Sequence, residues 1–327
     1  MAKFKVVVTD YVFPNLDIEK SIFEPYDVEL VAMQCKSADE LMPFVVDADI
    51  LLNTYLGGID RRLFSIMKKC KLIVRYGIGV DTIDINGATE YGIMVANVPD
   101  YCLDEVSDHA IACMLALTRK LTLSDRRVRN GLWDLGYLKP MRKISNLTVG
   151  VVGMGRIGRL SAGKVSAFGA RIIFSDPYVN EDSLDISAKK VTLNELVASS
   201  DVILIHAPAT PETHHLFDSN LFALMQRNPV IINCARGNLI DTNALVEALS
   251  KGIVSGAALD VIEGVPPFSP DHPLCRFENV IITPHSAWYS EEALINLQRL
   301  AAEEAARVLR GEKPRSLLNP EVLSKDV

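Results

Sequence analysis

The sequence of 327 residues lacks several features that mark particular classes of protein. No apolar run is long enough to cross a bilayer, and Met1-Ala2-Lys3-Phe4 leads directly into a strand-like run instead of a secretory signal. Basic residues occur only in short pairs such as Lys68-Lys69 and Arg126-Arg127, and the formal net charge is −7. We therefore expect no membrane partner and no direct nucleic-acid partner.

The cysteines also lack the CxxC spacing of disulfide and zinc frameworks. Several of the six lie in apolar runs, where free thiols behave as small core residues. This usage fits a reducing compartment, so we expect a cytoplasmic protein. The pair His214-His215 precedes Leu216-Phe217 in a loop, and we expect it to face solvent or to support another site residue, with no metal site.

One stretch that is present, from Thr148 to Asp176, has the pattern of a βαβ dinucleotide-binding unit. Gly153 permits a tight turn, Gly155 lets the backbone approach a pyrophosphate, and Gly158 lets helix and strand pack closely. The helix N-terminus offers N–H donors to the phosphates, and Asp176 would accept hydrogen bonds from a ribose and repel a 2′-phosphate. A bare GxGxxG can be an ordinary turn. With both strands, the helix and the acid in place, the pattern predicts that the cofactor is NAD.

The chain is long enough for two domains, and the first half has its own α/β rhythm without a GxGxxG. Its expected strands are 4–9, 28–31, 49–53, 72–75 and 93–96, with helices at 37–44 and 61–69. Six strands are expected from residue 148 onward: 148–152, 171–175, 202–206, 230–233, 257–259 and 280–283. The fold class is thus α/β, with two doubly wound parallel-sheet domains.

Two amphipathic helices, Asp104–Lys120 and Glu291–Leu309, are expected to connect these domains. A Rossmann cofactor domain, residues 103–291, would then be inserted in a flavodoxin-like substrate domain made of residues 1–102 and 292–327. The aromatic segment Gly131–Lys143 could be an interface arm or a surface loop, and the tail from Gly311 should be extended.

Polar residues follow the later strands, at the edge where an open α/β sheet binds ligands. These are His206-Ala207-Pro208, Cys234-Ala235-Arg236-Gly237, Asp260 and Thr283-Pro284-His285. An arginine could fix a carboxylate or carbonyl oxygen, and a histidine could move the hydroxyl proton while hydride passes to a nicotinamide. Taken singly, Arg236 could be a structural ion-pair partner, His285 a loop histidine and Asp260 a helix cap. His109 is expected to be a packing or interdomain residue.

In the first half, Arg75-Tyr76-Gly77-Ile78-Gly79 follows the strand at 72–75. Its two glycines could let successive N–H groups line a concavity for a small carboxylate, or could simply form a tight turn.

Several motifs together resemble those of the D-2-hydroxyacid dehydrogenases, in the branch with the C-terminal-binding-protein-like members. They are RYGIGVDTID, NVPDYCLDEVSDHA, VGVVGMGRIG, HAPATPETHHLF, NCARGNLID, GAALDV and TPHSAWYS, and they cover nearly the whole chain. The resemblance implies an oxidoreductase acting on a small 2-hydroxy or 2-keto acid, with its active site between two domains, and a homodimer formed through the cofactor domains.

The resemblance also implies roles for individual residues. Arg236 and His285 match the catalytic arginine and the acid/base histidine, and Asp260 matches the aspartate beside the nicotinamide. The expected cofactor-binding residues are Gly153, Gly155, Arg156, Ile157, Gly158, Asp176, His206, Pro208, Thr213, Ala235, Asp260 and His285. The expected substrate-binding residues are Arg75, Tyr76, Gly77, Ile78, Gly79 and Trp288, with Tyr76 and Trp288 suggesting an aromatic-lined pocket.

One position departs from the family pattern. The glutamate that usually precedes a proline five residues after the aspartate is Val265 here, and Pro266 keeps the register. A shift of two residues would offer Glu263 instead, but we favour substitution. Val265 would remove the neighbour that favours a protonated His285 and fixes its tautomer. The expected function is therefore an NAD-dependent 2-hydroxyacid dehydrogenase, and the alternative is an NAD(H)-binding sensor or scaffold, or a redirected chemistry.

Overall fold

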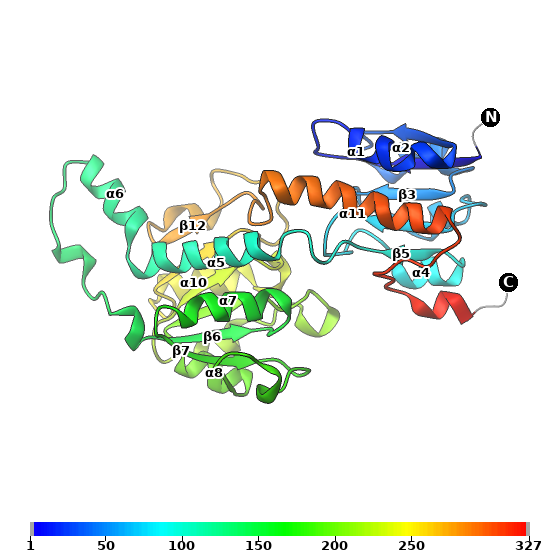
Figure 1. Ribbon diagram of the computed structural model, residues 1–327. Coiled ribbons are helices and arrows are strands. Elements are labelled where there is room, and N and C mark those ends of the chain that lie inside the picture. The colour runs from blue at the N-terminus through cyan, green and yellow to red at the C-terminus, as the bar shows by residue number, and fades with distance from the viewer. Residues whose placement is uncertain (1–2, 325–327) are drawn as a thin grey trace. The chain divides into compact units, whose positions relative to one another are not determined.

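The computed structural model describes residues 3–324, which form two compact units (Figure 1). Unit 1 is built from the chain up to Cys102 and from Tyr289 onward, and unit 2 is Leu103–Trp288. The second crossing thus falls at residue 289 instead of 292. Within residues 3–324, no helix combines the length and the apolar character needed to cross a bilayer.

Unit 1 contains a parallel five-stranded sheet with the order β2-β1-β3-β4-β5. Its strands are β1 (Phe4–Val8), β2 (Val28–Ala32), β3 (Ile50–Asn53), β4 (Leu72–Arg75) and β5 (Met94–Ala96). Its helices are α1 (Asp17–Phe23), α2 (Ala38–Val45), α3 (Arg61–Phe64), α4 (Ile85–Glu90) and α11 (Glu291–Leu309), with the 3-10 helices η1 (Glu24–Tyr26) and η8 (Pro320–Ser324). Strands β3 and β4 are buried along their whole length, as expected for a parallel sheet covered on both faces. This strand order is the flavodoxin-like order that was predicted.

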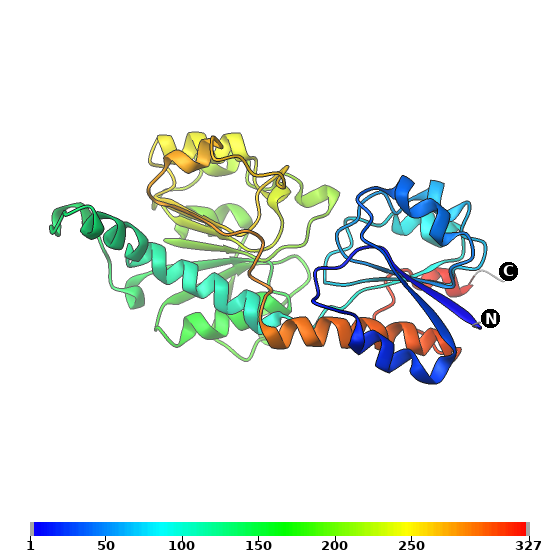
Figure 2. The same ribbon diagram turned by 90° about the horizontal axis from the view of Figure 1, so that it is seen from above.

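The end of the chain completes unit 1. Helix α11 packs against α1 and β4, and Figure 2 shows it running alongside α1. The tail is not simply extended, because it ends in η8 and Leu317 pairs with Ala96 at the edge of β5. Buried Asn319 fixes it by accepting a hydrogen bond from Val95 N (2.8 Å) and donating to Ile93 O (2.9 Å).

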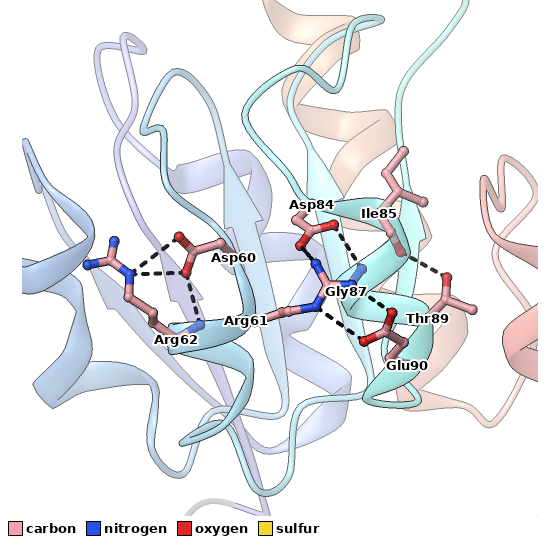
Figure 3. Close-up of polar contacts among 8 residues, drawn as sticks. All are labelled: Asp60, Arg61, Arg62, Asp84, Ile85, Gly87, Thr89 and Glu90. Atoms are coloured by element: carbon pink, nitrogen blue, oxygen red, sulfur yellow. Dashed lines mark hydrogen bonds and ion pairs between the residues drawn. The ribbon is translucent and has the colours of Figure 1, made fainter.

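Side-chain caps determine where α3 and α4 begin. Asp60 accepts from Arg62 N (3.0 Å) at the start of α3, and Asp84 accepts from Gly87 N (2.8 Å) at the start of α4. Arg61 lies between Asp84 and Glu90 and forms ion pairs with both (Figure 3). Helix α3 ends at Phe64, so the predicted helix over 61–69 was too long.

Unit 2 contains a parallel seven-stranded sheet with the order β12-β11-β10-β9-β6-β7-β8. Its strands are β6 (Thr148–Val152), β7 (Arg171–Ser175), β8 (Lys189–Lys190), β9 (Val202–Ile205), β10 (Val230–Asn233), β11 (Gly256–Leu259) and β12 (Val280–Ile282). This is the 3-2-1-4-5-6 order of doubly wound nucleotide folds with one further strand at the β12 edge. The prediction of two such domains is confirmed, although β8, a two-residue edge strand, was missed.

The helices of unit 2 lie on both faces of this sheet (Figure 1). They are α5 (Leu103–Thr118), α6 (Leu121–Arg129), α7 (Arg156–Ser166), α8 (Leu193–Ser199), α9 (Ser219–Ala223) and α10 (Thr242–Ser250). The 3-10 helices are η2 (Gly136–Leu138), η3 (Ile144–Asn146), η4 (Glu181–Ser183), η5 (Pro211–Thr213), η6 (Gly237–Leu239) and η7 (Pro273–Arg276). Alternate strand residues enter different cores: Val202 and Leu204 pack with α5 and α7, whereas Ile203 and Ile205 pack with α8 and α10.

Helix α6 and the segment up to residue 143 reach out from the rest of unit 2 in both views (Figures 1 and 2). The predicted helix over 104–120 stops at Thr118, because Lys120 adopts a left-handed conformation with φ 51° and the chain restarts as α6. Trp133 and Leu135 on this segment are 89% and 74% exposed. The choice between an interface arm and a surface loop stays a prediction. We call residues 121–143 the apolar arm because of its exposed Trp133 and Leu135.

Candidate functional site

The glycines that follow β6 have three different surroundings. Gly153 has φ 88°, and a Cβ there would lie 2.6 Å from Ala207 N. A Cβ on Gly158 would lie 2.1 Å from Gly153 O, so this glycine is needed for helix-strand packing. A Cβ on Gly155, in contrast, would have no atom within 4 Å. Open space beside Gly155 is what a closely approaching pyrophosphate requires.

The N-terminus of α7 is also open to a bound phosphate group. No side chain caps its first turn, Arg156 is exposed at its first position and Ile157 is half-buried. Asp176 follows β7, as predicted, and its Oδ2 accepts from Met154 N (2.8 Å) in the glycine loop. Its Oδ1 accepts from Tyr178 N (2.8 Å). Asp176 therefore braces the glycine loop, while its contact with a ribose stays a prediction.

His206 lies at the carboxyl end of β9, beside the glycine loop. Burial lowers the pKa of this histidine to about 4, so it is neutral at physiological pH. Its Nε2 is buried and has no hydrogen-bond partner among residues 3–324. Thr213 donates to Pro208 O (2.7 Å), which closes the loop after His206 into a turn. The open face of Gly155, the uncapped α7 and the orphaned Nε2 together fit a bound dinucleotide.

Buried Asn233 holds the loop after β10, which carries Arg236. It donates to Arg236 O (2.8 Å) and accepts from Ala235 N (3.0 Å). Arg236 is half-buried, and its Nη1 donates to Ala235 O (2.7 Å). At Gly237, a Cβ would lie 2.3 Å from the carbonyl carbon of Ile262, so only glycine allows this loop to pack against the next one.

Asp260 is buried and anchors the loop that carries His285. Its Oδ1 accepts from Thr283 Oγ1 (2.6 Å) and Ser286 N (2.9 Å), and its Oδ2 accepts from Ala287 N (3.0 Å). His285 between them is exposed and has φ 54°, an uncommon conformation for a residue with a side chain. A carboxylate has about four acceptor positions, so one remains on Asp260 for the predicted nicotinamide contact.

The sequence did not single out Thr283 or Asn233 as positioning residues. His109 also belongs to this network, because its Nε2 lies 3.1 Å from Thr283 Oγ1 and 3.9 Å from Asp260 Oδ1. The prediction that His109 is a packing or interdomain residue missed this polar role within unit 2. His109 reaches this network because its helix, α5, lies against β10 and β11, a contact that the sequence does not show.

Glu263, the alternative to the missing glutamate, is hydrogen-bonded to another histidine. Its carboxylate is hydrogen-bonded to His215 Nε2 at 2.7 Å. Val265 is half-buried and packs against the apolar core that contains Ile240 and Ile262. The surroundings of Val265 are thus apolar, which favours the substitution interpretation.

In unit 1, the turn after β4 is built around Gly77, with φ 141°. A Cβ there would lie 1.6 Å from Arg75 Nη1, so the arginine occupies the space that the missing side chain leaves. The guanidinium of Arg75 also lies 5.5 Å from the ring centre of Tyr55 and donates to Tyr76 O. Gly77 thus needs the conformational freedom of glycine, whereas Gly79 does not have a positive φ.

The expectation that Tyr76 lines a pocket was wrong. Its side chain is fully buried, and its hydroxyl donates to the buried carboxylate of Glu19 (2.9 Å), which also accepts from Gln298. Any substrate contact of Tyr76 would come from its backbone. Gly77 N donates to Arg75 O (2.9 Å), whereas within the described residues the amides of Ile78 and Gly79 have no acceptor. These two amides fit the predicted binding of a carboxylate.

The predicted residues thus form two sets. In unit 2, the glycine loop, Asp176 and the ends of β9 to β12 share one sheet edge, and Trp288 is half-buried where that unit ends. In unit 1, Arg75 and the turn up to Gly79 form the second set. The roles of all these residues, and the predicted active site between the domains, stay predictions.

The seven-stranded fold, the glycine loop and the uncapped helix N-terminus define unit 2 as a domain of the dinucleotide-binding class. Residues 111–287 match the family model "D-isomer specific 2-hydroxyacid dehydrogenase, NAD binding domain". The chain belongs to the D-isomer specific 2-hydroxyacid dehydrogenase family and uses NAD, so both of these predictions are confirmed.

Two curated relatives and one solved structure illustrate the similarity. The chain is 36% identical to the glyoxylate reductase of Thermofilum pendens, over 99% of this chain and 96% of that protein. It is 38% identical to the D-3-phosphoglycerate dehydrogenase of Methanocaldococcus jannaschii, over 96% of this chain but 59% of that protein. The D-lactate dehydrogenase of Aquifex aeolicus, solved with NAD and lactic acid, superposes with a TM-score of 0.85 at 27% identity, over 94% of this chain and 96% of that one. The relatives are glyoxylate reductases and phosphoglycerate dehydrogenases, so they do not support the C-terminal-binding-protein-like branch.

Proposed function

We propose that the protein reduces a small 2-keto acid to the corresponding 2-hydroxy acid. Bound NADH would supply the hydride. The residues that would hold the dinucleotide are the glycine loop, the first turn of α7, Asp176 and the ends of β9 and β11. The observation that carries the proposal is the placement of Arg236 and His285 on loops that follow β10 and β12 at the same edge of the sheet. Each loop is held by a buried polar anchor, Asn233 and Asp260 respectively.

In this proposal Arg236 binds and polarises the substrate carbonyl oxygen, because a guanidinium stabilises the negative charge that develops there. His285 in its protonated form gives its proton to that oxygen as the alkoxide forms, and takes the proton back in the oxidation direction. The amides of Ile78 and Gly79 bind the substrate carboxylate. Asp260 and Thr283 act through the loop that they fix and are positioning residues.

The relatives suggest the first substrate to test. The glyoxylate reductase of Thermofilum pendens matches along 96% of its length, which favours a short 2-keto acid such as glyoxylate. Activity would be assayed with NADH or NADPH on glyoxylate, pyruvate, hydroxypyruvate and longer 2-keto acids. Asp176 predicts a preference for NADH, because a carboxylate repels a 2′-phosphate.

Variants test the assigned roles. His285→Gln should lower kcat by at least ~100-fold, and Arg236→Lys should also lower it, because a lysine cannot offer the same fork of donors. His272→Ala, outside the predicted site, is the matched histidine control and should keep full activity. Parent protein that binds NADH yet reduces no 2-keto acid between acidic and neutral pH would refute the proposal.

Val265 supports a second candidate, an NAD(H)-binding sensor or scaffold with weak chemistry. Val265 is apolar where the family pattern has a glutamate, and the nearby Glu263 is hydrogen-bonded to His215. Val265→Glu should then raise 2-keto acid reduction by orders of magnitude if the second candidate is right. A change of less than about threefold would show that the site works without the carboxylate and would favour the reductase.

We also propose that the functional form is a homodimer, formed through the apolar arm between Leu121 and Lys143. Trp133 and Leu135 on the arm are exposed, and a cavity of about 450 Å³ at its base is partly lined by Leu117, Leu123 and Met141. In a two-fold arrangement the arm of each copy can reach the cavity of the other, which covers both surfaces. A Trp133→Ser, Leu135→Ser double variant should lower the molar mass measured by light scattering to that of one chain. A monomeric parent would refute the dimer.

A further inference from the structure

The structure brings together three metal-ligating side chains that the sequence separates. Glu263, 48 residues beyond His215, places its Oε1 2.7 Å from His215 Nε2 and 3.9 Å from His214 Nε2. One ligand atom from each of the three lies within 4.8 Å of the others. Within residues 3–324, these three residues are the group of histidine and acidic side chains that could hold a metal ion. Nothing near His214-His215 in the sequence indicated that Glu263 would be their neighbour.

The backbone at the histidines turns both rings to the same side. Adjacent side chains on an extended chain point in opposite directions. His214 is extended, with φ −60° and ψ 125°, but His215 has φ 50°, a conformation that a residue with a side chain adopts rarely. The two imidazole ring centres consequently lie 4.0 Å apart, and both rings approach the same carboxylate. Such backbone strain occurs where the surrounding structure holds a site together.

Three segments of unit 2 hold this arrangement in place. His215 N donates to Asn238 O (2.8 Å), and Phe217 pairs with Ile240, so the histidines are tied to the segment that follows Arg236. Gly237 in turn packs against the backbone of Ile262 and Glu263, where a Cβ would lie 2.4 Å from Glu263 N. The three ligands therefore come from segments that are packed directly against one another, and their positions do not depend on the side chains alone.

We propose that His214, His215 and Glu263 bind a divalent transition-metal ion of the Zn²⁺ type. Two imidazole nitrogens and one carboxylate oxygen are a ligand set that zinc accepts with water in the fourth position. Tetrahedral zinc with bonds of about 2.0–2.1 Å places its ligand atoms ~3.3 Å apart, so the 2.7 Å contact would open and the 3.9 Å contact would close by about half an ångström each. The three side chains are 53%, 34% and 35% exposed, which leaves room for the water.

The bound ion would join the segment that carries His214 and His215 to the segment that carries Glu263 and Val265. It is a stabilising site and not a catalytic one, because its ligands are not among the residues assigned to the reaction. Its test is consequently independent of the proposed reductase activity.

The experiment measures metal binding to the full chain after treatment with a chelator. Zn²⁺ is titrated by calorimetry, and Co²⁺ is used as a spectroscopic probe of tetrahedral coordination. We expect one ion per chain, no thiolate-to-cobalt band, and a higher Tm with Zn²⁺ than without. Cys275, the exposed cysteine, is replaced by serine in every protein to remove a competing ligand.

Two variants remove one ligand each with little change in the fold. Glu263→Gln keeps a hydrogen-bond acceptor for His215, and His215→Asn places a residue that tolerates φ 50°. Each should weaken Zn²⁺ binding by at least 10- to 100-fold, because even loss of a group that only orients a ligand has an effect of about that size. Each should also abolish the rise in Tm that Zn²⁺ causes. Unchanged NADH binding would show that unit 2 of the variant is still folded.

The matched controls are Glu212→Gln and His272→Ala, which remove an exposed acid near the cluster and a histidine elsewhere in unit 2. Both should bind Zn²⁺ like the parent. The proposal is overturned if the parent takes up no metal, or if the two ligand variants bind as tightly as the controls. In the first case the cluster is a hydrogen-bonded pair with a neighbouring histidine and nothing more.

Discussion

Alanine at Gly155 should weaken NAD binding without weakening the fold. A Cβ at this position has no atom within 4 Å, and the backbone, with φ −71° and ψ −160°, suits alanine. We therefore expect the free energy of unfolding without cofactor to change by less than about 0.5 kcal/mol. The added methyl group would occupy the open side of the loop where the pyrophosphate is expected, so NADH affinity should fall at least ~10-fold, about 1.4 kcal/mol.

Two other glycines of the same helix serve as controls. At Gly163, in the interior of α7, a Cβ also meets nothing within 4 Å, so alanine should raise stability by about 0.8–1.0 kcal/mol through helix propensity and leave NADH affinity unchanged. At Gly158 a Cβ would lie 2.1 Å from Gly153 O, so alanine should destabilise the fold by at least ~1–3 kcal/mol. Urea unfolding and NADH fluorescence titration measure the two effects separately. A Gly155→Ala protein that binds NADH like the Gly163→Ala protein would refute the placement of the cofactor at this loop.

Three further predictions concern buried polar groups. Burial raises the pKa of Glu19, so stability is lost as the pH rises through that raised value. Glu19→Gln should therefore have the larger free energy of unfolding at neutral pH, measured with urea. A difference between variant and parent that does not close toward pH ~4 would contradict this. Burial lowers the pKa of His206 from 6.5 to about 4, so the folded state should lose about 3 kcal/mol relative to the unfolded state as the pH falls between those values. The free energy of unfolding of His206→Gln should fall less steeply over this pH range. Equal slopes for variant and parent would argue against the buried neutral histidine. Asp260→Asn places an N–H₂ group against a backbone amide or the Thr283 hydroxyl, so kcat/KM should fall more than ~10-fold although His285 and Arg236 are intact. An unchanged kcat/KM in steady-state kinetics would exclude Asp260 as a positioning residue.

The sequence identified the elements whose signals are local. The glycine pattern at Gly153 to Gly158 and the apolar runs around it identified β6, α7 and β7, because these signals lie within about thirty consecutive residues. Helix α11 was predicted with its observed bounds, since Ser290 caps its start and the apolar residues keep a helical period. Strand β8 was missed because two lysines at a sheet edge carry no apolar pattern.

The remaining features depend on contacts between distant segments. Nothing near Tyr76 in the sequence shows that its hydroxyl meets Glu19, 57 residues earlier, in a buried network. The carboxylate of Glu263 reaches His215 only because Gly237 lets two loops pack closely. The left-handed turn at Lys120 likewise has no signature in a residue type that is usually helical. Side-chain partners of this kind follow from the tertiary fold and not from spacing.

The divided construction of unit 1 has a consequence for synthesis. Unit 2 is one continuous stretch of chain, so it can fold as soon as Trp288 has left the ribosome. Unit 1 cannot fold at that stage. Helix α11, which packs against α1 and β4, and Asn319, which binds the edge of β5, are made only after residue 288. Residues 3–102 therefore wait for packing partners that are made after the whole of unit 2. A ribosome stalled after unit 2 should expose a folded dinucleotide domain and an incomplete, chaperone-binding first sheet.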